Sequence, residues 1–158
     1  MATLLLIRHG IAEDPRPGQP DADRALTPEG WKRTRLAMQG LVARGYRPQR
    51  GFNSPYRRAA ETMACLQEAA GGFPLETSLE LTPGGRPGQA DLWLRSLLAE
   101  ATPDHVLAII SHEPFLSSLV FQLTGRSLEF KKAGCVIVTW DSGSWSFERH
   151  FQPMELRG

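Results

Sequence analysis

The stretch from Thr3 to Gly10 reads Thr-Leu-Leu-Leu-Ile-Arg-His-Gly, and it decides both the fold class and the position of the site. Its first five residues form an apolar run that stops abruptly at Arg8, which is typical of a strand buried on both faces of a parallel sheet. Ligands of open α/β sheets bind at the carboxyl ends of strands, where Arg8, His9 and Gly10 fall. Arginine binds anions, glycine allows close approach of the backbone, and histidine titrates near neutral pH. We therefore expect an anion-handling nucleophile at this strand end.

Length and composition limit the class of protein. The 158 residues suffice for one hydrophobic core, so we expect a single domain over residues 1–158. The net charge is +1 and charges of both signs are spread along the chain, which argues against a nucleic-acid partner. Cys65 and Cys135 lie at no metal-like spacing, so we expect reduced thiols and no metal site. No apolar run approaches the ~20 residues of a membrane span, and we expect a cytoplasmic protein without a membrane partner.

The first half of the chain alternates between loop, helix and strand. Residues 11–23 are rich in Pro, Gly and Asp and predict a loop, in which Asp21 is interpreted as a solvated acid. Thr27-Pro28-Glu29 is typical of a helix start, with threonine as the N-cap and proline in the first turn. A short strand over residues 50–53 then precedes Ser54-Pro55, which predicts the start of a second helix.

Two neighbouring arginines, Arg57 and Arg58, fall in the first turn of that second helix. Helix N-termini present free N–H groups and partial positive charge, so an arginine there adds to an anion site. Neighbouring residues point ~100° apart around a helix, and at most one of the pair can face the pocket. Spacing alone leaves open which one it is.

The second half of the chain repeats the pattern of a buried strand that ends in a histidine. Residues 75–81 predict a third strand or an extended connection, and a third helix follows around residues 94–101. The apolar run 105–110 ends in Ser111-His112-Glu113, and Pro114 opens the next helix. Two histidines at the ends of separate buried strands are the main internal evidence for a composite site.

The C-terminal part changes character. Residues 135–140 and 145–151 are β-rich and are separated by Asp141-Ser142-Gly143-Ser144, which indicates a hairpin. Strands alternate with helices up to residue 124. The sequence therefore predicts a three-layer α/β/α domain with a mostly parallel central sheet and an antiparallel C-terminal edge hairpin.

Four motifs together carry a family resemblance. In order and spacing they resemble the histidine phosphatase superfamily, which includes the phosphoglycerate mutases: Leu6-Ile7-Arg8-His9-Gly10, Leu26-Thr27-Pro28-Glu29-Gly30, Ser54-Pro55-Tyr56-Arg57-Arg58-Ala59-Ala60-Glu61-Thr62 and Ile110-Ser111-His112. Within that superfamily, the short chain and the stretches 8–14 and 79–85 resemble the SixA-type phosphohistidine phosphatases. The resemblance covers nearly the whole chain. It implies one histidine phosphatase domain with a phosphoglycerate mutase-like fold.

The resemblance also implies roles for individual residues. In the family's Ser-Pro-x-x-Arg-Ala motif the phosphate-binding arginine is the fourth residue after the serine, which is Arg58 here, so Arg57 is expected to point outward. His9 is then the nucleophile and becomes transiently phosphorylated. Arg8, Arg58 and His112 form the phosphate pocket, and no metal or cofactor is required.

Phosphoryl-transfer chemistry explains why these residue types are needed. A phosphoryl group in transfer spreads negative charge over its oxygens, which two guanidinium groups and a protonated His112 stabilise. His9 has to be neutral at its attacking nitrogen, with its other nitrogen held by a carbonyl group, and surrounding cations disfavour its protonation. Glu113 is expected to point away from the phosphate, because a carboxylate would repel it.

The leaving group bears on the substrate. An alkoxide needs a general acid, whereas imidazole, whose conjugate acid has a pKa of ~6.5, leaves more easily. Glu80 is the candidate acid, but its surroundings match the family's acid motif poorly. The resemblance to SixA-type proteins implies that this general acid is not needed. The loops at 11–25 and 82–90 are too short for a large lid, so an open pocket can admit a phosphorylated side chain.

We therefore expect a monomeric phosphatase that acts on phosphohistidine in a partner protein, such as a histidine-containing phosphotransfer domain or a similar phosphorelay protein. Two alternatives remain from the sequence. One is a small-molecule phosphomonoesterase on the same scaffold, and the other is an inactive module that docks phosphorylated partners.

Overall fold

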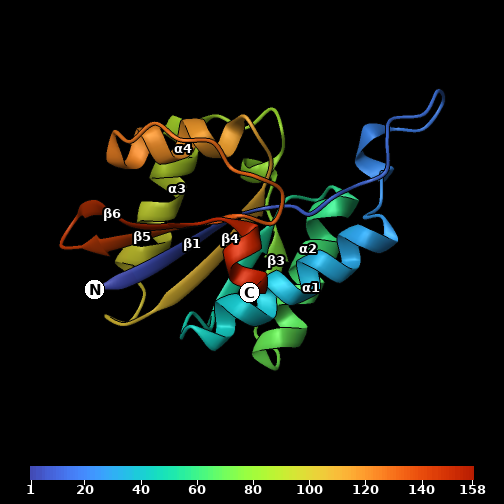
Figure 1. The fold of residues 1–158 in the computed structure, drawn as a ribbon. Coiled ribbons are helices and arrows are strands. Elements are labelled where there is room, and N and C mark those ends of the chain that lie inside the picture. The colour runs from blue at the N-terminus through green and yellow to red at the C-terminus, as the bar shows by residue number, and fades with distance from the viewer.

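The computed structural model describes all of residues 1–158 and arranges them around one six-stranded sheet with the order β3-β2-β4-β1-β5-β6 (Figure 1). Four strands are parallel: β1 (Ala2–Arg8), β2 (Arg50–Asn53), β3 (Leu75–Thr77) and β4 (Val106–Ser111). The last two form an antiparallel hairpin at one edge: β5 (Cys135–Asp141) and β6 (Ser144–Phe151). The predicted mostly parallel sheet with a C-terminal hairpin is confirmed.

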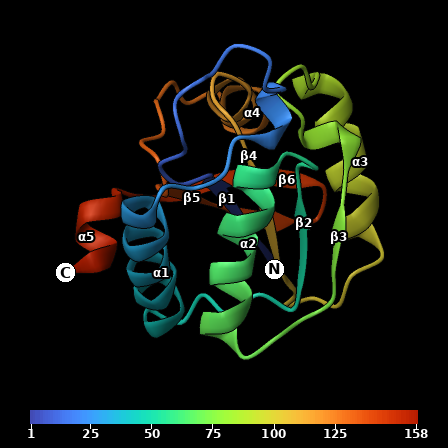
Figure 2. The same ribbon diagram turned by 90° about the vertical axis from the view of Figure 1, so that its right-hand side faces the viewer.

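Helices cover both faces of the sheet, as Figure 2 shows when it is compared with Figure 1. One face carries α1 (Pro28–Ala43), α2 (Arg57–Ala70) and the short α5 (Pro153–Arg157). The other face carries α3 (Pro87–Ala99) and α4 (Phe115–Thr124). Two short 3-10 helices, Asp21–Asp23 and Leu79–Leu81, interrupt the connections. The three-layer expectation is therefore confirmed.

The apolar run of β1 lies at the centre of the sheet, between β4 and β5. Its side chains alternate between the two faces: Leu4 and Leu6 pack toward α3 and α4, whereas Leu5 and Ile7 pack toward α1 and α2. All four are 0% exposed, as expected for a strand covered on both sides. Burying one such side chain contributes about 1.5–3 kcal/mol, so β1 anchors both halves of the core.

Close packing of α1 fixes the residues that follow β1. Thr27 caps the helix, since its hydroxyl accepts the Gly30 N–H at 2.9 Å, and Pro28 occupies the first turn as predicted. Further along α1, the Thr34 hydroxyl lies where a side chain at position 10 would begin: a Cβ on Gly10 would be 2.0 Å from Thr34 Oγ1. Gly10 is therefore required for close approach of this helix to the end of β1.

Some elements differ from those predicted. Only Leu75–Thr77 of the stretch 75–81 forms a strand, and Leu79–Leu81 is a 3-10 helix. The second helix begins at Arg57 rather than at Ser54-Pro55, because the Ser54 hydroxyl accepts the Tyr56 N–H and holds this stretch as a turn. The third helix begins earlier, at Pro87, which fits the first turn of a helix. The five-residue α5 was not predicted, because it is too short to show helical periodicity. None of the helices combines the length and the apolar character needed to span a bilayer.

Candidate active site

The sheet topology brings the two histidines together. Strands β1 and β4 are parallel neighbours, with Arg8 in register with Ser111, so His9 and His112 follow at the same edge. Their ring centroids are 5.2 Å apart, with 57° between the ring planes. Strand β2 pairs with the other side of β4, and the start of α2 after it brings Arg58 to the same place. The composite site expected from the two strand ends is therefore present in the structure.

A cavity of about 360 Å³ lies at this edge of the sheet. All four residues of the expected phosphate pocket line it, together with further charged and apolar residues from the neighbouring loops: Arg8, His9, Ala12, Asp14, Pro15, Arg24, Arg58, Pro83, His112, Glu113 and Lys132. Four of these side chains are Arg or Lys and two are acidic. We refer to this cavity as the catalytic pocket.

His9 is held in a single tautomer. Its Nδ1 lies 2.8 Å from the Gly10 carbonyl oxygen, which can only accept, so Nδ1 carries the proton. On the other side of the ring, Arg58 Nε donates to His9 Nε2 at 3.4 Å, which requires Nε2 to be unprotonated. Burial, followed by the charges of Arg58, Arg8 and Lys132, lowers the pKa of His9 to about 4 against the opposing effect of the Gly10 hydrogen bond. The ring therefore presents a neutral, nucleophilic Nε2 at physiological pH.

His112 is also neutral in the free protein. Burial, together with the charges of His9 and Arg58, lowers its pKa to about 3. The protonated form predicted from the sequence applies to the site during phosphoryl transfer and stays a prediction. Its Nε2 lies 2.8 Å from the Ser54 hydroxyl. A phosphoryl dianion in the pocket would favour proton uptake by His112, because an opposite charge stabilises the imidazolium form.

Two buried polar atoms of the site have no partner within the protein. They are His112 Nδ1 and Arg8 Nε. Arg8 is otherwise positioned by its Nη1, which donates to the Phe130 carbonyl at 2.8 Å. An unpaired buried polar group costs about 1–3 kcal/mol, and such a cost is expected where a ligand supplies the missing partner. Two orphaned atoms beside a neutral histidine fit an oxyanion in the pocket.

The structure separates the two neighbouring arginines. The side chain of Arg58 is 5% exposed and faces the catalytic pocket, whereas that of Arg57 is 60% exposed and pairs with Glu61 at 3.2 Å. Arg58 is held at the far end of its guanidinium group, where Nη1 donates to the Asp21 carbonyl at 2.8 Å and Nη2 contacts Asp21 Oδ2 at 3.1 Å. The inward arginine is therefore the one that the family motif implies.

Asp21 departs from its interpretation as a purely solvated acid. Its side chain is 53% exposed, yet it pairs with both Arg24 and Arg58. The pKa of its carboxyl group is lowered, chiefly by the hydrogen bond from Arg24 and then by Arg58. The loop that follows β1 therefore returns over the pocket and holds its arginine, a long-range contact without a sequence signal of its own.

Two further residues of the α2 motif support the site but were not singled out from the sequence. The Tyr56 ring stacks edge-on against His112, with centroids 5.0 Å apart, and the Arg58 guanidinium lies 5.0 Å from the Tyr56 ring centroid. The Thr62 hydroxyl accepts the Gly10 N–H at 3.0 Å and donates to the Arg58 carbonyl at 2.8 Å. Both residues belong to the quoted motif 54–62, which was the available signal.

Glu80 is not among the residues that line the catalytic pocket. It lies in the short helix Leu79–Leu81, and its carboxylate makes no hydrogen bond or ion pair within the protein. Pro83, from the same connection, lines the pocket instead. The structure therefore brings Arg8, His9, Arg58 and His112 together and leaves Glu80 outside this group.

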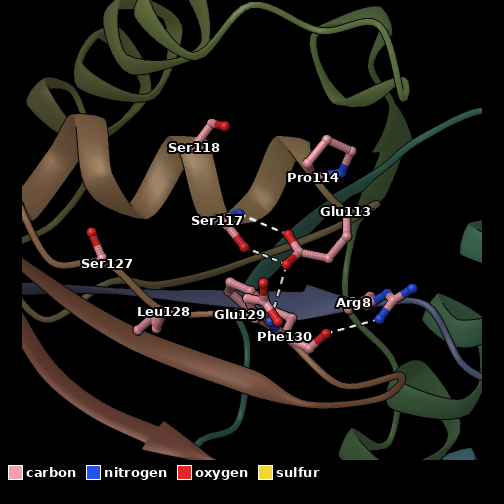
Figure 3. Close-up of a pocket in the computed structure, with 9 residues that line it drawn as sticks. All are labelled: Arg8, Glu113, Pro114, Ser117, Ser118, Ser127, Leu128, Glu129 and Phe130. Carbon is pink, nitrogen blue, oxygen red and sulfur yellow. Dashed lines mark hydrogen bonds between the residues drawn. The ribbon is translucent and has the colours of Figure 1, made fainter.

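A wider cleft of about 740 Å³ adjoins the catalytic pocket and shares Arg8 and Glu113 with it (Figure 3). The Glu113 carboxylate faces α4 and the segment after it, where it accepts the Ser117 N–H at 2.8 Å and the Phe130 N–H at 3.1 Å. Phe130 in turn accepts from Arg8. Glu113 is thus held by these partners and connects α4 to Phe130, which positions Arg8. It also lines the catalytic pocket, so its orientation away from a bound phosphate stays a prediction.

No group of three or more His, Cys, Asp or Glu side chains lies close enough together to hold a metal ion. Cys65 and Cys135 are free and buried, and burial raises the pKa of both thiols. The charged side chains that line the catalytic pocket are three arginines, one lysine and two acids.

Comparison with known proteins identifies the family and its solved relatives. The family model described as "Histidine phosphatase superfamily (branch 1)" matches residues 4–82. An uncharacterised protein of Picosynechococcus sp. is 35% identical over 93% of this chain and 89% of its own.

Two solved structures extend the comparison to the whole fold. The protein histidine phosphatase SixA complexed with tungstate has a TM-score of 0.88 and 28% identity, over 98% of this chain and 99% of that one. The putative phosphohistidine phosphatase SixA of Agrobacterium tumefaciens has a TM-score of 0.80 and 22% identity, over 96% and 97%.

Proposed function

We propose that this chain, which belongs to the histidine phosphatase superfamily (branch 1), hydrolyses phosphohistidine on a partner protein through a phosphorylated His9. The family and its phosphatase relatives make the chain a phosphatase. The choice of substrate and the role of each residue are our proposal. One observation carries it: the two contacts that hold the His9 ring leave Nε2 unprotonated inside a pocket that contains Arg8, Arg58 and His112.

The proposed reaction has two phosphoryl transfers. In the first, the lone pair of His9 Nε2 attacks phosphorus, and the bond from phosphorus to the substrate imidazole nitrogen breaks. The departing imidazole keeps the bonding pair and takes a proton from solvent. In the second, water attacks the phosphoryl group on His9, loses a proton and releases inorganic phosphate. His9 returns to its neutral form, so the cycle consumes only water.

Three residues stabilise the phosphoryl group in this scheme. Arg8 and Arg58 bind its oxygens, and the unpartnered Arg8 Nε and His112 Nδ1 are the atoms that gain a partner. His112 takes up a proton as the dianion enters and donates a hydrogen bond from then on. Before substrate binds, the contact with Asp21 keeps Arg58 oriented toward the pocket. When the phosphoryl group enters, Arg58 exchanges part of this contact for the phosphoryl oxygens.

The phosphohistidine preference rests on the leaving group. Glu80 lies outside the catalytic pocket, and the two acids that line it, Asp14 and Glu113, come from other segments. An imidazole leaving group needs less assistance from an acid than an alkoxide does. The solved relative at 28% identity is described as a protein histidine phosphatase and was crystallised with tungstate, a tetrahedral oxyanion. Both points favour a phosphohistidine substrate over a phosphate ester.

The wider assignment follows from the same proposal. Residues 1–158 act as one histidine phosphatase domain, and the partner is a histidine-containing phosphotransfer domain or a similar phosphorelay protein. We also propose that the protein is a monomer, that it acts in the cytoplasm, and that it uses no metal or cofactor.

The test compares substrates at equal concentration: a histidine-phosphorylated phosphotransfer domain, a sugar phosphate and an acyl phosphate. We expect the phosphoprotein to have the highest kcat/KM, and we expect His9→Ala to abolish its turnover. The matched control is His105→Ala, a histidine that lines a separate cavity and not the catalytic pocket. Faster turnover of the small molecules would instead favour the phosphomonoesterase, and stable binding of the phosphoprotein without turnover would favour the inactive module.

A further inference from the structure

A second hollow lies beside the catalytic pocket and is lined by basic side chains. It has a volume of about 390 Å³ and lies between α1, α5 and the segment that precedes β5. Four of its ten lining residues are cationic and none is acidic: Arg33, Lys131, Lys132 and Arg157. We call this site the basic hollow. Figure 2 shows α5 alongside α1, which forms one wall of it.

The basic hollow adjoins the catalytic pocket. Lys132 lines both, and its charge is one of those that lower the pKa of His9. The next residue, Ala133, donates its N–H to the carbonyl groups of Arg8 and His9, at 3.1 and 3.2 Å. The segment that carries the two lysines is therefore hydrogen-bonded directly to the backbone of Arg8 and of His9, the proposed nucleophile. A ligand whose phosphoryl group lies in the catalytic pocket can therefore contact the basic side chains with its neighbouring residues.

The positive charge of this hollow is largely uncompensated. Lys131, Lys132 and Arg157 take part in no ion pair, and only Arg33 has one, with Glu29 at 2.5 Å. The whole chain has a net charge of only +1, so this concentration is local. Unpaired cations in a concave site attract anionic groups and raise the rate of encounter with them. Met154, which is 74% exposed, adds apolar surface of the kind that a polypeptide can cover.

We propose that the basic hollow docks acidic side chains that flank the phosphohistidine of the protein substrate. This inference rests on the proposed function and adds the character of the partner: a polypeptide with Glu or Asp residues close to the phosphorylated histidine. A small phosphate ester bound in the catalytic pocket carries no flanking acidic side chain for Lys131 or Arg157 to bind. The basic hollow therefore selects a protein substrate over a small molecule with the same phosphoryl group.

The test uses two synthetic peptides that differ only beside the histidine. Both are phosphorylated chemically on that histidine, and the flanking residues are glutamates in one and glutamines in the other. We expect the wild-type protein to show a kcat/KM roughly five- to tenfold higher for the acidic peptide, with the preference declining as salt is added. The double variant Lys131→Glu/Arg157→Glu should lose or invert this preference, measured as the ratio of its kcat/KM values for the two peptides.

Matched controls separate a local effect from a general one. Arg50→Glu/Arg126→Glu changes the net charge by the same amount at residues outside both cavities and should keep the preference for the acidic peptide. Lys131→Gln/Arg157→Gln provides a milder variant if the charge reversal impairs folding. Equal wild-type kcat/KM values for the two peptides, or a preference that survives both basic-hollow variants, would overturn this inference alone. Failure to hydrolyse either peptide would overturn the proposed function and this inference with it.

Discussion

The arginine beside His9, the proposed nucleophile, differs sharply from its neighbour in the sequence. Arg58 donates to His9 Nε2 and is almost fully buried, whereas Arg57 points to solvent and pairs with Glu61. Arg58→Ala removes the guanidinium group that we propose binds the phosphoryl oxygens, and we expect kcat/KM to fall roughly 10²–10³-fold. Arg57→Ala should change kcat/KM by less than about threefold, as is usual for surface residues. Steady-state kinetics on both variants check this, and equal losses would contradict the assignment of Arg58.

The two buried histidines also predict how stability depends on pH. The pKa of His9 is lowered from 6.5 to about 4, and that of His112 from 6.5 to about 3. Between these values and pH 6.5, the native state therefore binds fewer protons than the unfolded state. Their contribution to the free energy of unfolding is complete above pH 6.5 and is lost as pH falls toward these values. Between neutral pH and a pH of about 5, each histidine should cost about 1–2 kcal/mol of stability.

Urea unfolding in phosphate-free buffer measures this effect. The variant His9→Asn/His112→Asn should lose less stability on acidification than the wild-type protein. The pKa values of His105 and His150 are also lowered, so only the difference between the two proteins reports on the pair. Parallel loss of stability in both proteins would show that the site histidines are not held neutral by the fold.

At the scale of secondary-structure elements, the start of α4 supports the site through Glu113. Its carboxylate bridges Ser117 and Phe130, and Phe130 positions Arg8 (Figure 3). In Glu113→Ala, the Phe130 N–H loses its partner and the segment before β5 loosens. We expect a loss of about 1–3 kcal/mol in unfolding free energy and phosphate binding weaker by at least about threefold.

Calorimetric titration with inorganic phosphate measures this loss of affinity. Glu113→Gln should recover part of it, since an amide oxygen can still accept one of the two N–H groups. Glu80→Ala is the matched control, because that carboxylate has no partner within the protein and lies outside the catalytic pocket. If Glu113→Ala unfolds more easily but binds phosphate as the wild type does, its role is structural only.

The elements that were predictable from sequence are those with strong local signals. The strands β1 and β4 are continuous apolar runs, the start of α1 combines a threonine cap with a proline, and the C-terminal hairpin has a turn with Ser142 and Gly143 at positive φ. The start of α2 was displaced because the Ser54 hydroxyl holds a turn, and α5 was too short for periodicity to indicate. Local patterns therefore gave the type of most elements, and side-chain contacts decided the boundaries.

At the scale of the whole molecule, the site depends on contacts between distant segments. The predicted strand ends were enough to place Arg8, His9 and His112 at one edge of the sheet. The spacing of residues alone did not show whether Arg57 or Arg58 faces the pocket. The pairing of Asp21 with Arg58 joins residues 37 positions apart and has no local pattern. The low pKa of His112 in the empty site has no sequence signal, because burial, its main cause, is a property of the folded chain. Tertiary packing thus supplied what sequence motifs left open.

Direct detection of a phosphoryl group on His9 tests the central claim of this account. The protein is mixed rapidly with a histidine-phosphorylated phosphotransfer domain, quenched in alkaline denaturant to preserve phosphohistidine, and mapped by mass spectrometry. We predict that one phosphoryl group appears transiently on the peptide that contains His9, and that His9→Ala shows neither this species nor release of phosphate. Release of phosphate by the wild-type protein with no phosphoryl group on His9, or with one on another residue, would contradict the account.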